Sequence, residues 1–326
     1  MQNSLGTISN DYLTLMQSYL IGSIFRDPAA ERLRPGAFKK PFEQRYFDTY
    51  LRENGADVPK NAFTMIGAKR MANIRTLAET LIRDQIEGDF IETGVWRGGA
   101  SIFMRAILLA YGIKDRRVWL ADSFEGLPKA DAEKYPADNF VDFSSIDLLK
   151  VSLEVVQENF SQLDLLDDQV KFLKGWFKDT LPNAPIKQLA LLRLDGDMYE
   201  STMDALNALY PKLSPGGYVI VDDYVLPCCK LAIHDFFKSQ GIDPELVTID
   251  EYSVYWRKSA PDKITSLEKA SVTPTLAPAS TELIRPILKL NQVVITKLTE
   301  ALNESDGKFN RLNKKINSLT NQGEPK

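Results

Sequence analysis

Four aspartates follow two apolar runs whose lengths are typical of buried strands, and we call these four the acidic cluster. They are Asp195, Asp197, Asp222 and Asp223. The first pair closes the run 189–194 and the second pair closes the run 218–221. Carboxylates held close together repel one another and raise each other's pKa, and a divalent cation between them removes that cost. Oxygen ligands favour Mg²⁺ or another hard ion, and a single histidine, His234, cannot build a histidine-rich zinc site.

A second motif, Glu92-Thr-Gly94-Val-Trp-Arg-Gly98-Gly99-Ala-Ser101, leaves a predicted strand and enters a predicted helix. Its glycines allow a sharp turn and let a ligand approach the backbone. Asp122 ends the next strand, where a carboxylate can accept the hydroxyls of a ribose. The spacing is not the Gly-x-Gly-x-x-Gly of nicotinamide cofactors, and Glu92 would repel a pyrophosphate. A carboxylate at this place suits the cationic methionine end of S-adenosylmethionine.

Both motifs also have a plainer interpretation. Any one aspartate of the acidic cluster could cap a helix or shape a turn, and Asp197 stands just before the helix predicted near Glu200. A turn between a strand and a helix can need glycines for its backbone alone. Four carboxylates at two matched strand ends favour the metal site over these alternatives.

Residues 88–258 contain the elements that must position these motifs, because short apolar runs alternate there with helical patterns. This alternation predicts an α/β fold with a parallel sheet covered on both faces, whose ligands bind at the carboxyl ends of the strands. The last two strands are too close in sequence for a crossover helix and should pair antiparallel. The predicted strands are 90–93, 117–121, 170–174, 189–194, 218–221, 246–249 and 253–256, and the predicted helices are 100–111, 148–159, 200–213 and 229–240.

The flanking segments have a different character. Residues 1–87 read as mostly helical, with proline-bearing interruptions at 28–35 and 55–59. Residues 259–282 read as a linker, and residues 283–326 as a helical extension. Apolar residues recur in this extension at three- and four-residue steps, in two runs separated at 305–307, namely Ile287, Leu290, Val294 and Leu298, then Phe309, Leu312, Ile316 and Leu319. Self-association and docking on the chain's own domain both fit this pattern.

Composition restricts the class of protein. The 326 residues carry a formal net charge of −4, which gives no electrostatic reason to expect a nucleic-acid partner. No apolar run approaches the roughly 20 residues that a membrane-spanning helix needs. The two cysteines, Cys228 and Cys229, are adjacent and offer no disulfide framework. We therefore expect a soluble, cytoplasmic protein that acts on a small molecule and is not bound to a membrane.

Three blocks of sequence carry a resemblance to a known family. They begin at Asp122 (DSFEGLP), at Leu194 (LDGDMYEST) and at Ser214 (SPGGYVIVDDY). With these blocks the chain resembles the macrocin O-methyltransferase family from about Tyr12 to Lys258. The resemblance implies a class I S-adenosylmethionine methyltransferase with a Rossmann-like seven-stranded sheet, its last strand antiparallel, and an N-terminal helical lid over residues 1–87. It also implies methyl transfer to sugar hydroxyls of glycosylated secondary metabolites, by an enzyme that we expect to be a homo-oligomer.

The resemblance also assigns expected roles to individual residues. Mg²⁺ ligands are expected at Asp195, Asp222 and Asp223, and the general base at Asp197. Contacts to S-adenosylmethionine are expected from Glu92, Gly94 and Ser101 of the glycine turn, Asp122 at the ribose, Ser123, Gly175 and Trp176 near the adenosine, and Met65 and Ile66 from the lid.

Two other functions fit part of the pattern. The same metal site could activate a catechol or another phenol, but catechol-type enzymes keep a lysine where this chain has Met198. A scaffold that retains the cofactor fold without catalysis is a different class, and the four repelling carboxylates argue against it. The sequence explains neither His234 nor Arg193, a charged residue inside a predicted buried strand.

Overall fold

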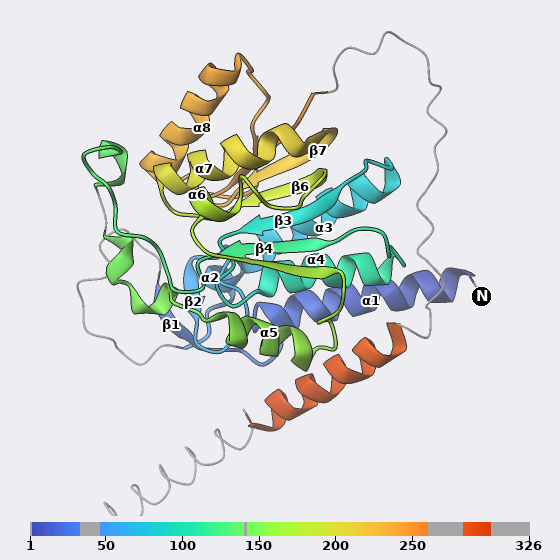
Figure 1. The fold of residues 1–326 in the computed structure, drawn as a ribbon. Coiled ribbons are helices and arrows are strands. Elements are labelled where there is room, and N and C mark those ends of the chain that lie inside the picture. The colour runs from blue at the N-terminus through green and yellow to red at the C-terminus, as the bar shows by residue number, and fades with distance from the viewer. Residues whose placement is uncertain (1, 33–45, 140–141, 260–282, 301–326) are drawn as a thin grey trace, which may run out of the picture.

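The computed structural model describes residues 2–32, 46–139, 142–259 and 283–300 and centres on a seven-stranded sheet (Figure 1). The strand order is β5-β4-β3-β6-β7-β9-β8. The first five strands in this order are parallel, whereas β9 runs antiparallel to both β7 and β8. The strands are β3 (Asp89–Thr93), β4 (Val118–Asp122), β5 (Val170–Lys174), β6 (Leu189–Leu194), β7 (Leu213–Val221), β8 (Val247–Thr248) and β9 (Val254–Arg257). The predicted seven strands and the antiparallel pairing of the last two are confirmed.

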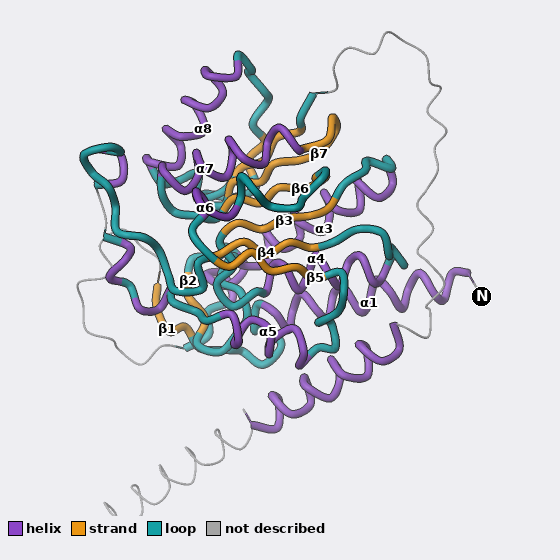
Figure 2. The backbone as a smooth tube through the Cα atoms, viewed as in Figure 1, coloured by secondary structure: helices purple, strands orange, loops and turns teal. Residues whose placement is uncertain are grey.

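Helices cover both faces of the sheet (Figure 2). Each face has its own apolar core. One face carries α1 (Gln2–Leu20), α3 (Gly67–Arg83), α4 (Gly99–Ala110) and α5 (Leu153–Gln162). The other face carries α6 (Phe177–Thr180), α7 (Tyr199–Leu209) and α8 (Pro227–Gln240). Strands buried on both faces are normally apolar throughout. All six residues of β6 are buried, so Arg193 stands out as its one charged residue.

The strand order brings the two motifs to one place. From β3 the chain runs outward through β4 and β5, then crosses back to place β6 on the other side of β3. Ligands bind at such a reversal in open α/β sheets. In the register of β3 and β6, Glu92 lies beside Arg193. The amide of Asp195 donates to the carbonyl of Thr93, and that of Asp222 donates to the carbonyl of Leu194, so the ends of β3, β6 and β7 lie side by side.

Two predicted helices are shorter in the structure. The helix predicted over residues 200–213 ends at Leu209, and a 3₁₀ turn, η5 (Tyr210–Lys212), leads directly into β7. Pro211 explains this early end, because its ring nitrogen has no hydrogen to continue the helical ladder. The helix predicted from residue 148 begins only at Leu153. It is preceded by the short turns η2 (Pro136–Asp138), η3 (Phe143–Ser145) and η4 (Asp147–Leu149).

The N-terminal region packs on the sheet domain and contains more than helices. Leu13 and Met16 of α1 are buried in the same core as α4. The two predicted interruptions form a small antiparallel sheet of β1 (Ala29–Arg32) and β2 (Asp57–Pro59), with α2 (Thr49–Glu53) before β2. The buried Arg52 holds this region together through an ion pair with Asp57 at 2.9 Å and a hydrogen bond to the carbonyl of Ile21 at 2.6 Å.

At the other end of the described chain, residues 283–300 form one helix that docks beside the domain (Figure 1). Leu290 and Val294 of the predicted apolar run are buried in the core, and Ile287 packs against it. The fourth member, Leu298, is exposed. The run 309–319 and nearly all of the linker 259–282 lie outside the described residues. None of the helices in the described part of the chain has the length and apolar character that crossing a membrane requires.

Candidate active site

A cavity of about 750 Å³ lies at the carboxyl ends of the parallel strands and gathers nearly all of the predicted site residues. All four aspartates of the acidic cluster line it. The predicted cofactor residues on its wall are Met65, Ile66, Glu92, Gly94, Asp122, Ser123, Gly175 and Trp176. Ser101 is different, because it is fully buried on α4 and lies behind Glu92, to which its hydroxyl donates a hydrogen bond.

The turn after β3 depends on Gly94. Its φ of +93° lies in the region that favours glycine, and a Cβ at this position would stand only 1.7 Å from the carbonyl oxygen of Asp195. The absence of a side chain therefore lets the end of β3 approach the end of β6. This close approach places Glu92 next to the acidic cluster.

Replacing Gly94 by alanine is expected to destabilise the protein by more than the 1–2 kcal/mol or so that the left-handed backbone alone costs an L-residue. The excess comes from the clash with Asp195, which must push β3 and β6 apart. Gly241→Ala is the matched control, because Gly241 has a φ of +63° but no atom within 4 Å of its Cβ position. Urea unfolding of both variants measures the difference, and equal losses of stability would contradict the close-approach argument.

Two carboxylates lie on the part of the cavity wall where the sequence predicts the cofactor, Glu92 and Asp122. Burial raises the pKa of Glu92 to about 7, although Arg193 and Ser101 lower it. Asp122 accepts the backbone N–H of Val95 and that of Phe124, each at 2.7 Å. Burial raises the pKa of Asp122, and these hydrogen bonds oppose the increase. Both carboxylates are thus held rigidly on the cavity wall.

The acidic cluster has the geometry of a cation site. Carboxylate oxygens of Asp195, Asp222 and Asp223 all lie within 4.8 Å of one another. Asp197 has a left-handed φ of 58°, and its amide donates to Asp223 Oδ2 at 3.0 Å. Burial and the nearby Asp195 raise the pKa of Asp197 to about 8, and burial raises the pKa of Asp195 to about 6 despite Arg193. The neighbouring positive charges therefore do not fully offset the burial and mutual repulsion of these carboxylates.

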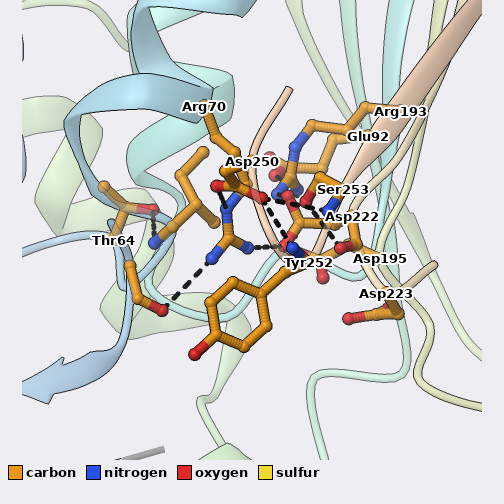
Figure 3. Close-up of polar contacts among 12 residues, drawn as sticks. Thr64, Arg70, Glu92, Arg193, Asp195, Asp222, Asp223, Asp250, Tyr252 and Ser253 are labelled. Atoms are coloured by element: carbon orange, nitrogen blue, oxygen red, sulfur yellow. Dashed lines mark hydrogen bonds and ion pairs between the residues drawn. The ribbon is translucent and has the colours of Figure 1, made fainter. Parts of the chain in front are cut away.

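Arg193 is the buried centre of this network (Figure 3). Its Nη1 contacts Glu92 Oε1 at 2.6 Å and Asp195 Oδ2 at 2.7 Å, and its Nη2 contacts Asp222 Oδ1 at 2.5 Å. A guanidinium can hold several carboxylates because its donors form a rigid planar fork. Arg193 therefore connects Glu92 at the end of β3 to aspartates that follow both β6 and β7.

A second arginine, Arg70 on α3, reaches the same cluster from the N-terminal region. It pairs with Asp222 and, at 3.0 Å, with Asp250, and it donates to the carbonyl of Gly55 at 3.1 Å (Figure 3). Its guanidinium also lies 5.2 Å from the centre of the Tyr252 ring. Arg70 and Tyr252 both line the cavity. Sequence reasoning missed Arg70, Asp250 and Tyr252.

The residues of this site can hold a divalent cation in addition to the two arginines. Among the described residues, this network contains six carboxyl groups but only two guanidinium groups, those of Arg70 and Arg193. The carboxyl groups belong to Glu92, Asp195, Asp197, Asp222, Asp223 and Asp250. Among the described residues, no side chain donates a hydrogen bond to the Asp197 carboxylate. Two positive charges cannot balance this set, and oxygen donors are the ligands that Mg²⁺ prefers. The donor chemistry is therefore suited to a hard divalent ion.

Proteins that are similar to this chain in sequence are O-methyltransferases. Residues 9–258 match the family described as macrocin-O-methyltransferase (TylF). The mycinamicin III 3''-O-methyltransferase of Micromonospora griseorubida is 53% identical over 212 residues, which are 64% of this chain and 84% of the relative. The 8-demethyl-8-(2,3-dimethoxy-alpha-L-rhamnosyl)-tetracenomycin-C 4'-O-methyltransferase of Streptomyces olivaceus is 47% identical over 262 residues, 80% of this chain and 97% of the relative.

A solved structure agrees with these relatives. The O-methyltransferase NovP superposes with a TM-score of 0.72 at 48% sequence identity, and the match covers 77% of this chain and all of NovP. The sheet, with its antiparallel final strands, is that of a class I S-adenosylmethionine methyltransferase. The chain belongs to the macrocin O-methyltransferase family and is an S-adenosylmethionine-dependent O-methyltransferase.

Proposed function

We propose that this enzyme methylates a sugar hydroxyl of a glycosylated secondary metabolite with the help of Mg²⁺. The observation that carries the proposal is the acidic cluster, whose three close carboxylates share one cavity with the cofactor turn. The name of the Streptomyces olivaceus relative specifies a rhamnosyl group, which makes a deoxysugar the first acceptor class to test.

The cavity divides naturally between donor and acceptor. Glu92 and Gly94 would hold the methionine end of the cofactor, and Asp122 its ribose. Ser123, Gly175 and Trp176 would surround the adenosine. Met65 and Ile66 belong to an N-terminal segment that would act as a lid, because this segment reaches the cavity from outside the sheet. Leu226 and Pro227, before and at the start of α8, line the wall near the acidic cluster, where an acceptor would bind.

Asp195, Asp222 and Asp223 would hold the Mg²⁺. When bound, S-adenosylmethionine supplies a methyl group on a positive sulfur, and Mg²⁺ lowers the pKa of an acceptor hydroxyl. Asp197 would take the hydroxyl proton as the carbon–oxygen bond forms and the carbon–sulfur bond breaks. The buried arginines would keep the carboxylates in place during this step, and the apolar part of the cavity wall, which includes Met65, Ile66 and Leu226, would limit the access of water to the methyl group.

Methyl transfer assays test this proposal directly. We expect product with S-adenosylmethionine, Mg²⁺ and deoxyhexosides of macrolide or polyketide aglycones, detected as a mass gain of one methylene. The matching aglycones without sugar are the control for acceptor class. Methylation of an aglycone phenol in preference to every sugar hydroxyl would refute the sugar assignment while leaving the methyltransferase assignment intact.

Asp223→Asn is expected to weaken Mg²⁺ binding at least about tenfold, since even residues that only orient metal ligands typically contribute this much. The asparagine can still accept the Asp197 amide, so the local turn should persist. Calorimetric Mg²⁺ titration and the Mg²⁺ dependence of the rate measure the effect. Asp179→Asn, at an exposed position on α6, controls for the loss of one negative charge. Unchanged Mg²⁺ affinity in Asp223→Asn would exclude Asp223 as a ligand.

A further inference from the structure

The helix over residues 283–300 has two apolar faces, and only one of them is used within the chain. Leu283, Leu290 and Val294 are buried against the core beneath α1, α4 and α5. Arg285 reinforces this docking through an ion pair with Asp164 at 2.8 Å. The helix is therefore docked on the domain, and a second row of apolar residues beside the docked face stays exposed to solvent.

The second face, which we call the outer stripe, consists of large apolar residues in contact with solvent. Ile284, Leu288, Ile295 and Leu298 are exposed by 49%, 63%, 64% and 38%. These four make up a third of the twelve large exposed hydrophobic residues in the described part of the chain. Single exposed apolar residues need no explanation, but several aligned on one short helix mark an interaction surface.

The spacing of the outer stripe is that of a helix which pairs with another helix. Together with Asn291, its members follow one another at steps of four, three, four and three residues. This heptad pattern keeps one seam facing a partner along a supercoiled pair. The sequence continues the same steps beyond residue 300, in order Leu302, Ser305, Phe309, Leu312, Ile316 and Leu319. Those residues lie outside the described structure, and only their spacing in the sequence is known.

We propose that the outer stripe is a dimer interface, in which the C-terminal helices of two copies of this chain pair in parallel and in register. The stripe lies outside residues 9–258, which match the family. The proposed interface therefore does not depend on which acceptor the enzyme methylates.

Asn291 indicates that the partner of the outer stripe is a second copy of this chain. A polar side chain at a core position costs free energy unless a partner group satisfies it. An identical helix, parallel and in register, brings its own Asn291 to the same level, where the two amides hydrogen-bond to each other. An antiparallel or shifted arrangement would leave each asparagine facing an apolar residue.

The mass of the full-length protein in solution tests the interface. Light scattering after gel filtration at tens of micromolar should give twice the chain mass of 36.8 kDa. Ile295→Glu, which places a charge in the centre of the stripe, should shift the protein to the monomer mass. Thr296→Glu is the matched control, since the neighbouring Thr296 is exposed and lies off the stripe, and it should remain dimeric. A monomeric wild type, or a dimer that survives in Ile295→Glu, would overturn the proposal.

A cysteine cross-link tests orientation and does not depend on the glutamate variant folding. Asn291→Cys should form an intermolecular disulfide on mild oxidation, because parallel helices in register bring position 291 of both chains together. The native cysteines are buried, and Thr296→Cys is the control that should not cross-link. Failure of Asn291→Cys to cross-link in a dimeric sample would exclude the parallel arrangement in register.

Discussion

Arg193→Met is expected to destabilise the fold by about 3–5 kcal/mol, the usual result of removing one partner from a buried ion network. Methionine fills similar space but leaves Glu92, Asp195 and Asp222 without the guanidinium that contacts all three. Glu92 and Asp222 are themselves buried, so water cannot replace the lost donors fully. Thermal unfolding should show a decrease in melting temperature on the order of 10 °C.

Arg257→Met provides the comparison for this experiment. Arg257 also lies on a strand of the sheet and also pairs with a carboxylate, Asp84, at 2.9 Å. Its side chain is 44% exposed, and exposed ion pairs contribute about 1 kcal/mol or less. Arg193→Lys should fall between the two variants, because one ammonium keeps the charge but cannot span three carboxylates. If the melting temperature of Arg193→Met is no lower than that of Arg257→Met, the ion network around Arg193 is not required for stability.

Arg193 also illustrates what a sequence can and cannot reveal. A charged residue within an apolar strand is visible as an anomaly. Two of its three partners, Glu92 on β3 and Asp222 directly after β7, come from strands that adjoin β6 only in the folded sheet. Arg70 carried a similar signal. It falls on the buried side of α3 with Gly67, Met71 and Ile74, where an amphipathic helix should be apolar. In both cases a charge on an apolar face indicated a buried ionic network.

The acidic cluster was easier to predict, because parallel strands end at the same edge of a sheet. Four aspartates directly after two such strands had to meet wherever those strands were neighbours, and β6 and β7 are neighbours. The glycine turn was less informative about individual side chains. Its spacing predicted a cofactor loop and a helix that contains Ser101, but could not show that Ser101 lies behind Glu92 and away from the cavity wall.

Most strand limits could be predicted to within a residue or two because short apolar runs are bounded by charged, polar or glycine residues; the exception is β7, which begins at Leu213, five residues before the predicted start. Segments whose structure depends on tertiary contacts could not. The pairing of β1 with β2 joins residues about 28 positions apart, and only their folded neighbours make those short runs strands. The C-terminal helix shows a further limit: the sequence placed Leu298 in one run with Leu290 and Val294, and only the docked helix shows that Leu290 and Val294 are buried while Leu298 is exposed.

Asp197→Asn is expected to lower kcat by about 10²–10⁴-fold, the range associated with loss of a general base. The substitution is unusually clean, because asparagine tolerates the left-handed backbone of this position as well as aspartate does. The backbone contacts of residue 197, its amide to Asp223 and its carbonyl to the Cys228 thiol, do not involve the side chain. Folding and the affinity for S-adenosylmethionine should therefore stay near those of the wild type.

The decisive comparison for the base is a second carboxylate in the same cavity. Asp204 on α7 also lines the wall, and burial, with Glu200 nearby, raises its pKa to about 6. The charged groups nearest in effect to Asp204 are Glu200 and Lys178, whereas those acting on Asp197 are Asp195 and Asp222 of the acidic cluster. Asp204 is therefore poorly placed to take a proton from a hydroxyl held at the acidic cluster. Single-turnover rates of Asp197→Asn and Asp204→Asn at saturating Mg²⁺ separate the two candidates. A larger loss in Asp204→Asn would transfer the role of base to α7 and move the acceptor hydroxyl away from Asp197.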